Sequence, residues 1–186
     1  LEQRFEVTVP PGDAELPRDG LLSAVRGADG LLAMISDRVD DELLDAAGPR
    51  LRVVANFAVG YDNLDVPALA ARGVVATNAP GVIADATAEL AIGMMLALGR
   101  RIVEGDRLLR SGAEWRWAPG FMLGWGLRGR RLGIVGLGEI GSRVATLAAA
   151  HGMEVAWAGR GEQPGVAWPR LGLDQLLGWA DVVSLH

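Results

Sequence analysis

Three glycines with the spacing G-x-G-x-x-G stand between an apolar run and a helical pattern. They are Gly136, Gly138 and Gly141, and the run before them reads "LGIV". In a strand–turn–helix setting the first glycine makes a tight turn, the second lets the main chain approach a pyrophosphate, and the third lets the helix pack close to its strand. The pattern is weak by itself in a chain with 26 glycines, but its setting is the one that a dinucleotide requires. We therefore expect this turn, including Glu139 and Ile140, to bind a dinucleotide, with a ligand-free turn as the alternative.

The strand that follows the turn ends in Gly159 and Arg160. A site for NAD places Asp or Glu about 20 residues after the glycines, where the carboxylate accepts hydrogen bonds from the adenosine ribose. Here Gly159 stands at the acidic position, which removes repulsion of a 2′-phosphate, and the Arg160 guanidinium can donate charge-assisted hydrogen bonds to that group. The pair predicts NADP as the cofactor, with NADPH preferred over NADH. NAD binding and a solvated loop arginine are the alternatives.

The composition restricts the classes of protein to which the chain can belong. Its 186 residues suit one domain or two small ones, and 50% of them are hydrophobic, which indicates a globular chain. A net charge of −5, with 18 scattered arginines and no lysine, argues against nucleic acid as a partner. The longest apolar run, residues 86–99, contains Glu89 and is too short to cross a membrane. The absence of cysteine excludes disulfides and thiolate metal sites and favours the cytoplasm.

Short apolar runs alternate with helical patterns along the chain, which is typical of an α/β fold. We expect strands at residues 5–10, 28–35, 74–78, 132–136, 153–158 and 181–185, and a buried strand that runs into a loop at residues 51–60. We expect helices at residues 39–48, 64–73, 85–110, 140–150 and 173–179. Asp65 is expected to cap the helix at 64–73. The Gly- and Trp-rich residues 111–126 are expected to form a linker or an interface loop.

Five segments carry a resemblance to a known family. They read "VVANFAVGYDNLDVPALAARGVVATNAPGV" (53–82), "ADATAELAIGMMLALGRRIVEGDRLLRSG" (84–112), "WRWAP" (115–119), "LRGRRLGIVGLGEIG" (127–141) and "ADVVSLH" (180–186). In this order they resemble the D-isomer-specific 2-hydroxyacid dehydrogenases, and above all their glyoxylate/hydroxypyruvate reductase branch. The resemblance implies a flavodoxin-like substrate domain at residues 1–99, without its first strand and helix. It also implies a Rossmann-type NAD(P)-binding domain at residues 100–186, without its C-terminal part.

The resemblance assigns roles to residues outside the glycine turn. The loop from Phe57 to Tyr61 matches the family's substrate-carboxylate loop, in which the main-chain N–H groups of Val59 and Gly60 would bind the anion. Such a loop is a nest of converging amides, and Gly60 is expected to relieve the steric cost of its turn. A plain strand-ending turn is the alternative. Thr87 matches a position that faces the nicotinamide, although a buried helix threonine would look the same.

Two further matches concern the partner subunit and the phosphates. Trp115 and Trp117 match a segment at the dimer interface of this branch, which implies a homodimer, while loose core packing explains them equally well. Glu139 stands where the family commonly has arginine. Its carboxylate would weaken phosphate binding unless it points to solvent, so an exposed Glu139 is a condition for the NADP prediction.

The implied activity is that of an oxidoreductase. Hydride would pass between NADPH and C2 of a small 2-oxo acid of the glyoxylate or hydroxypyruvate type. The family's catalytic arginine, glutamate and histidine match positions beyond His186, so no catalytic residue is assigned here and the chain by itself is expected to be inactive. His151 is expected to cap a helix, and His186 matches a position near the adenosine. The alternatives are a nucleotide-sensing interaction module of the corepressor type and an inactive truncated product.

Overall fold

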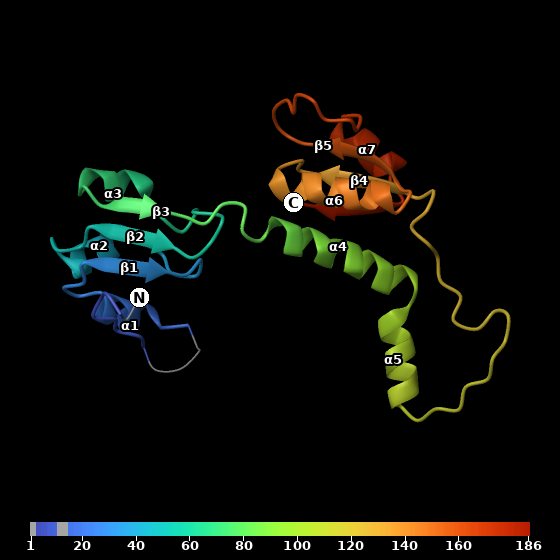
Figure 1. Cartoon of the computed structure of the whole chain (residues 1–186), viewed down its shortest axis with the longest axis horizontal. Coiled ribbons are helices and arrows are strands. Elements are labelled where there is room, and N and C mark those ends of the chain that lie inside the picture. Colours follow the sequence, from blue (N-terminus) through green and yellow to red (C-terminus); the bar gives the residue numbers. More distant parts are fainter. Residues whose placement is uncertain (1–2, 11–14) are drawn as a thin grey trace. The chain divides into compact units, whose positions relative to one another are not determined.

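The computed structural model describes residues 3–10 and 15–186, and the chain divides into two compact units (Figure 1). The first unit is Leu1–Val82 and the second is Ile83–His186. Each contains a parallel sheet with helices packed against it, so the expected α/β fold is confirmed. None of the described helices combines the length and the apolar composition that crossing a membrane requires.

Three parallel strands form the sheet of the first unit. Its elements are, in order, α1 (Arg18–Ala24), β1 (Gly30–Ala33), α2 (Asp41–Ala47), β2 (Val53–Asn56), α3 (Val66–Ala71) and β3 (Val75–Thr77). The strand order is β1-β2-β3, with Val54 aligned between Leu31 and Ala76. The Asp65 carboxylate accepts a hydrogen bond from the Ala68 amide at 2.9 Å, so the predicted cap of α3 is confirmed. The fully buried core residues of this unit include Val39, Leu43, Val54 and Leu69.

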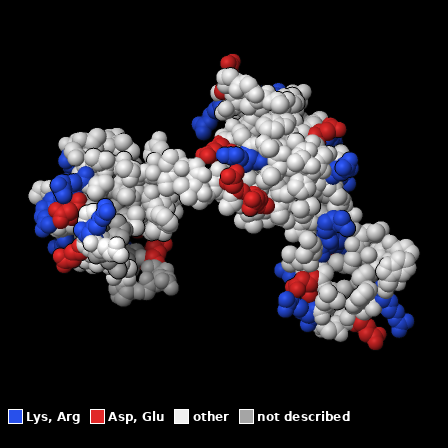
Figure 2. Space-filling view, in the orientation of Figure 1, with Lys and Arg blue, Asp and Glu red and all other residues white. Residues whose placement is uncertain are grey.

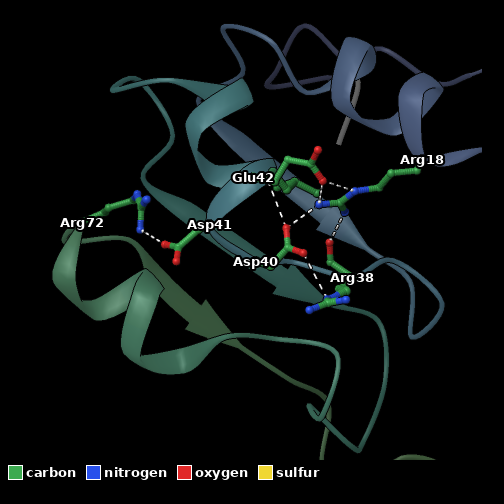
Figure 3. Close-up of polar contacts among 7 residues, drawn as sticks. Arg18, Arg38, Asp40, Asp41, Glu42 and Arg72 are labelled. Atoms are coloured by element: carbon green, nitrogen blue, oxygen red, sulfur yellow. Dashed lines mark hydrogen bonds and ion pairs between the residues drawn. The ribbon is translucent and has the colours of Figure 1, made fainter.

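Arginines pair with carboxylates around α2 on the surface of the first unit (Figure 3). Arg18 of α1 donates from Nε to Glu42 Oε2 at 3.0 Å and pairs with Asp40. Arg72, which follows α3, pairs with Asp41 at 2.6 Å. Exposed pairs of this kind contribute about 1 kcal/mol or less each, so they orient α1 and α3 on α2 while the buried core supplies most of the stability. On the face shown in Figure 2, arginines and acids likewise stand in clusters of mixed sign.

The second unit contains the glycine turn. Its elements are α4 (Ala84–Gly99), α5 (Ile102–Arg110), β4 (Arg131–Val135), α6 (Glu139–Ala150), β5 (Glu154–Ala158), α7 (Leu173–Trp179) and β6 (Val182–Leu185). The strands are parallel in the order β5-β4-β6, and α4 lies along α6 (Figure 1). An ion pair from Asp85 to Arg143, 3.2 Å long, joins these two helices. The buried core of the second unit includes Ala88, Ile92, Met95, Ile134, Val144 and Trp157.

The helix expected at residues 85–110 is two helices, α4 and α5. Arg101 between them has a φ of 54°, in the left-handed region. The carbonyl oxygen of Gly99 accepts a hydrogen bond from the Trp125 amide at 2.7 Å instead of one from the next helical turn. A Cβ at Gly99 would lie 2.9 Å from the Trp125 oxygen, so only glycine allows this approach. The single-helix prediction is therefore wrong, because a distant loop segment captures the carbonyl at which α4 ends.

The structure also differs from the sequence expectations at two places near the start of the chain. Residues 5–10 form no strand, although their apolar alternation predicts one. Phe5, Val7 and Val9 are all exposed, so this segment has neither a neighbouring strand nor a core to cover. Helix α1 was not expected, because seven residues that include a glycine give a weak helical pattern. Residues 11–14 of the preceding stretch lie outside the described residues.

Helix α4 decides where the chain divides. Its side chains Ala88, Ile92 and Met95 are buried in the core of the second unit. The division by packing therefore falls between residues 82 and 83. The resemblance implies a boundary at residues 99 and 100 instead, so α4 is the segment on which the two divisions differ.

The start of β4 is joined to the start of β6 by a charged pair that predicts a pH dependence. The Asp181 carboxylate accepts hydrogen bonds from the Arg131 guanidinium at 3.1 Å and from the Arg131 amide at 2.9 Å. These bonds, and above all the one from the guanidinium, lower the pKa of Asp181 to about 2. A carboxyl whose pKa is lowered by folding stabilises the folded state above its ordinary pKa of 3.8, and this contribution is lost as the pH falls towards 2.

We expect Asp181→Asn to lower stability in urea unfolding at about pH 6, and the difference from the wild type to shrink steadily towards about pH 2. Glu162→Gln, which removes an exposed acid of the same unit, is the control and should show little of this dependence. A difference between Asp181→Asn and the wild type that stays constant over this range would contradict the role of the Arg131 pair.

Candidate functional site

The glycine turn brings three main-chain segments into direct contact. Gly136 has a φ of 95°, which favours glycine, and a Cβ there would overlap the main-chain oxygen of His186 at the end of β6. A Cβ at Gly141 would overlap the main-chain oxygen of Gly136. Gly136 therefore permits the turn beside β6, and Gly141 permits the close approach of α6 to β4, as the spacing predicts.

Gly138 differs from the other two glycines because its surroundings are open. A Cβ at this position would meet no atom within 4 Å, and the residue is exposed. Gly138 is the N-cap of α6 and offers no side-chain cap, and its carbonyl accepts from the Ser142 amide at 2.9 Å. The N–H groups of Glu139, Ile140 and Gly141 belong to the first turn of α6 and have no hydrogen-bond partner within the helix. They therefore face the open side of the turn, where the positive end of the helix dipole attracts an anion.

The two residues that follow Gly138 differ in burial. The Glu139 side chain is exposed to solvent. Ile140 is half-buried and packs against the core of the second unit. This packing anchors the first turn of α6 while its main-chain N–H groups stay accessible.

The end of β5 lies beside the glycine turn. A Cβ at Gly159 would lie 3.7 Å from the Cα of Gly136 and 3.4 Å from the ring of Trp157. These are ordinary van der Waals distances, so a side chain at position 159 would fit and would border the turn. Arg160, the next residue, is exposed, and no carboxylate of the described residues pairs with it. The structure thus brings the predicted turn and the predicted Gly159-Arg160 pair together.

Arg170 joins this group from a later part of the chain. Its Nη2 donates to the Gly159 carbonyl at 2.7 Å, and its guanidinium lies over the Trp157 ring, 5.3 Å from the ring centroid. Sequence reasoning missed this residue. The contact depends on a parallel bridge between Trp157 and Arg170, which no local pattern around Arg170 indicates.

In the first unit, the loop after β2 is organised by a buried asparagine. Asn56 is 3% exposed, and its Nδ2 donates to the Gly60 carbonyl at 2.9 Å. The amides of Asn56 and Asn63 also bond to each other reciprocally, at 3.1 Å in both directions. Asn63 in turn donates to the Asp37 carbonyl at 3.0 Å, so the loop is tied to the segment after β1.

Two more donors hold the neighbouring carbonyl groups of the same loop. Asn78 Nδ2 donates to the Val59 carbonyl at 2.7 Å. The Ala79 amide donates to the Ala58 carbonyl at 2.9 Å. Together with the bond from Asn56, three consecutive carbonyl groups are therefore turned towards protein donors.

The peptide geometry then fixes where the loop amides point. No peptide bond of the described residues is cis, and in a trans peptide the N–H points away from the preceding C=O. The N–H groups of Val59, Gly60 and Tyr61 therefore point away from the donors that hold these carbonyls. Gly60 has no positive φ, so its expected steric role is wrong: the three carbonyl hydrogen bonds set the turn. A Cβ at Gly60 would meet nothing within 4 Å, so the space on this side is open.

Thr87 and the two histidines complete the set of candidate residues. Thr87 lies half-buried in the first turn of α4, where its amide donates to the Ile83 carbonyl at 2.9 Å. His151 Nδ1 lies 2.8 Å from the Leu147 carbonyl, so its expected role at the end of α6 is confirmed. His186 Nε2 lies 2.8 Å from the hydroxyl of Ser184, and burial lowers its pKa. The described residues contain no cluster of three or more His, Asp or Glu that could hold a metal ion.

Comparison with known proteins identifies the family. Residues 1–163 match the family model described as "D-isomer specific 2-hydroxyacid dehydrogenase, catalytic domain". The chain belongs to this family. Members of this family are oxidoreductases, and the proteins similar to this chain include glyoxylate reductases. That of Thermococcus kodakarensis is 47% identical over 169 residues, which are 88% of this chain and 50% of the relative. That of Thermococcus litoralis is 41% identical over 195 residues, with 100% of this chain and 58% of the relative covered.

Two solved structures are also similar to this chain. The TT0316 protein from Thermus thermophilus is 44% identical, with a TM-score of 0.94 over 100% of this chain and 58% of that one. D-lactate dehydrogenase from Aquifex aeolicus, solved with NAD and lactic acid, is 27% identical, with a TM-score of 0.76 over 92% and 50% of the two chains. The chain thus spans about half the length of the curated relatives and solved structures that it matches.

The candidate sites of this chain contain residues that sequence reasoning did not single out, among them Asn56, Asn78 and Arg170. Of these residues, only Asn56 could have been found from the sequence pattern around it. An asparagine that ends the apolar run "VVAN" must satisfy its amide inside the protein, and the loop after the strand offers the nearest carbonyls. No local sequence pattern indicates Asn78 or Arg170, because their hydrogen-bond partners lie far away in the sequence.

The different surroundings of Gly138 and Gly141 predict that alanine destabilises the two positions unequally. We expect Gly141→Ala to lower the free energy of unfolding by about 1–3 kcal/mol, because its methyl group would overlap the Gly136 oxygen. Gly138→Ala should cost less than about 1 kcal/mol, because its methyl group enters open space and only the preference for glycine at an N-cap is lost. Urea unfolding of both variants at one pH tests this. Equal losses would mean that α6 can shift to accommodate a side chain.

Proposed function

We propose that the full-length protein transfers hydride between NADPH and a small 2-oxo or 2-hydroxy acid of the glyoxylate or hydroxypyruvate type. The observation that carries the proposal is the open glycine turn at Gly138 with Gly159 and Arg160 beside it. The second unit would act as a Rossmann-type cofactor domain. The first would act as a flavodoxin-like substrate domain.

The residues of the turn fit a dinucleotide. The main chain at Gly138 is bare on its open side, as the close approach of a diphosphate requires. The N–H groups of Glu139, Ile140 and Gly141 supply donors and the positive end of the α6 dipole. When bound, the nicotinamide would supply the hydride chemistry. The chain's own contribution is to bind and orient the phosphates, with Thr87 proposed to lie near the nicotinamide.

The preference for NADPH follows from charge at the end of β5. An acid at position 159 would repel a 2′-phosphate, and glycine removes that repulsion. Arg160 is exposed and has no carboxylate partner among the described residues, so its guanidinium can bind the phosphate without first breaking an ion pair. NAD is the alternative cofactor.

The loop after β2 supports a role in binding the substrate carboxylate. The N–H groups of Val59, Gly60 and Tyr61 point away from the protein donors that hold the loop, into open space. Adjacent amides that converge on one side bind an anion as a nest. The loop would therefore orient the 2-oxo acid through its carboxylate, without a charged side chain of its own.

An exposed apolar surface on the second unit supports assembly as a homodimer. Helix α5 buries none of its side chains, and Ile102 and Leu109 are exposed. In the loop after it, Trp115 stacks on Phe121 with ring centroids 5.9 Å apart, and Trp117 is 79% exposed. Apolar side chains grouped in this way commonly mark a protein interface, and a second copy of the chain is the proposed partner.

We expect the full-length protein to reduce glyoxylate or hydroxypyruvate with a higher kcat/KM for NADPH than for NADH. Arg160→Ala should reduce this preference about tenfold, because it removes a charge-assisted hydrogen bond to the phosphate. Gly159→Asp should move the preference towards NADH, since its Cβ has room at 3.4 Å from Trp157 and its carboxylate can accept from the ribose. Steady-state kinetics with both cofactors measure this. Binding of NADPH without turnover of any 2-oxo acid would favour a nucleotide-sensing module instead.

We expect Gly60→Val to raise KM for the 2-oxo acid at least about tenfold while leaving the Kd for the nucleotide unchanged. The valine side chain would occupy the open space towards which the loop amides point, and the glycine turn would stay intact. Gly126→Val is the matched control, because its Cβ also enters open space but lies outside both loops. Parallel losses of substrate and nucleotide binding in Gly60→Val would indicate damage to the fold instead of the substrate loop.

A further inference from the structure

Two arginines reach the end of β5 from different parts of the chain. Arg160 follows the strand directly. Arg170 arrives on a segment that runs beside β5: the Trp157 amide donates to the Pro169 carbonyl at 3.0 Å, and the Leu171 amide donates to the Trp157 carbonyl at 2.8 Å. These two bonds fix the main chain on both sides of Arg170. The arginine is thus placed by strand-like pairing and not by a free loop.

The side chain of Arg170 is also fixed. Its Nη2 donates to the Gly159 carbonyl at 2.7 Å, and its guanidinium lies on the ring of Trp157. Trp157 is 3% exposed and donates from Nε1 to the Trp168 carbonyl at 3.2 Å, so the ring itself has one orientation. A guanidinium held by a hydrogen bond and by an aromatic face loses little conformational entropy when it binds a further group.

The position of this guanidinium matters because of what Gly159 borders. A Cβ at Gly159 would lie 3.7 Å from the Cα of Gly136 in the glycine turn. In a dinucleotide site this position faces the adenosine ribose. Arg170 is therefore hydrogen-bonded to the residue that would lie nearest the ribose hydroxyls. Because positions 136 and 159 are both glycine, no side chain from either would stand between the guanidinium and the ribose.

The charge of Arg170 is not neutralised within the described residues. No carboxylate pairs with Arg170 or with Arg160, whereas Arg131, which also lies over a tryptophan, is paired with Asp181 at 3.1 Å. Only one of the five N–H donors of Arg170 is used on Gly159. The remaining donors form a planar fork suited to phosphate oxygens.

We infer that Arg170 is a second determinant of cofactor choice, which together with Arg160 binds the 2′-phosphate of NADP. This inference rests on the proposed function, because it takes NADP as the ligand of the turn. A purely structural Arg170, which only covers Trp157, would affect nucleotides with and without the 2′-phosphate equally. The two roles are therefore separable by binding alone.

The test uses two probes that differ only in the relevant group, 2′,5′-ADP and 5′-AMP, titrated calorimetrically into the full-length protein. Arg170→Met removes the charge and keeps a long stem on Trp157. We expect it to weaken 2′,5′-ADP about tenfold and to leave 5′-AMP unchanged. Arg130→Met is the matched control: Arg130 lies 5.6 Å over Trp125, before the start of β4 and so at the end of the strand opposite the turn. It should leave both affinities unchanged.

Each alternative outcome has a distinct meaning. Equal affinity of the wild type for both probes would overturn the NADP preference and this inference with it. A wild-type preference that persists in Arg170→Met would overturn the role of Arg170 and leave the proposed function standing. Loss of both probes in a folded Arg170→Met would assign Arg170 to the structure around Trp157 and overturn the inference. If Arg170→Met does not fold, the neutral and polar Arg170→Gln serves instead: a reduced preference for 2′,5′-ADP would support the inference, and an unchanged one would overturn it.

Discussion

The packing of the second unit depends on direct contacts between main-chain atoms, which only glycine allows. Gly136 sits against the oxygen of His186 at the end of β6, and Gly141 sits against the oxygen of Gly136. Any side chain at either position would push β6 or α6 away from β4. Because α6 also carries α4, by packing and by the pair of Asp85 with Arg143, such a shift would pass into the larger core. At Gly138, by contrast, the surroundings are open, since a Cβ there would meet no atom within 4 Å.

The first unit shapes its loop by the opposite means, with side chains that grip the main chain. Asn56, Asn63 and Asn78 direct their amides at carbonyl groups or at each other. A buried asparagine that lacked these partners would cost about 1–3 kcal/mol, so the loop and the asparagine stabilise each other. Because these carbonyls are occupied by protein donors, the proposed substrate site can use the amides of Val59 and Gly60.

The proposed cofactor site separates two tasks in space. The glycine turn would contact the diphosphate, which NAD and NADP share. The end of β5, with Gly159, Arg160 and Arg170, would contact the ribose, where the two cofactors differ. Arg160 and Arg170 are exposed, whereas Gly136 and Gly141 are tightly packed, so in the proposed site a change of cofactor choice at the two arginines would leave the packed glycines undisturbed.

The sequence by itself determined the features that depend on neighbouring residues. The glycine spacing, the apolar runs of β4 and β5 and the cap at Asp65 all indicate structures formed within a few residues, and all are found. The family could also be inferred, since its motifs are local strings. The local pattern misled at residues 5–10, where apolar alternation found no neighbouring strand, and at Arg101, where Trp125 ends the helix by taking the Gly99 carbonyl.

Only the tertiary structure decided which core receives α4, which donors hold the loop of Val59, and which residue reaches the end of β5. The physical reason is the same for each. A hydrogen bond or a buried contact between residues far apart in the chain depends on how the elements pack, and packing leaves no mark on the few residues around either partner.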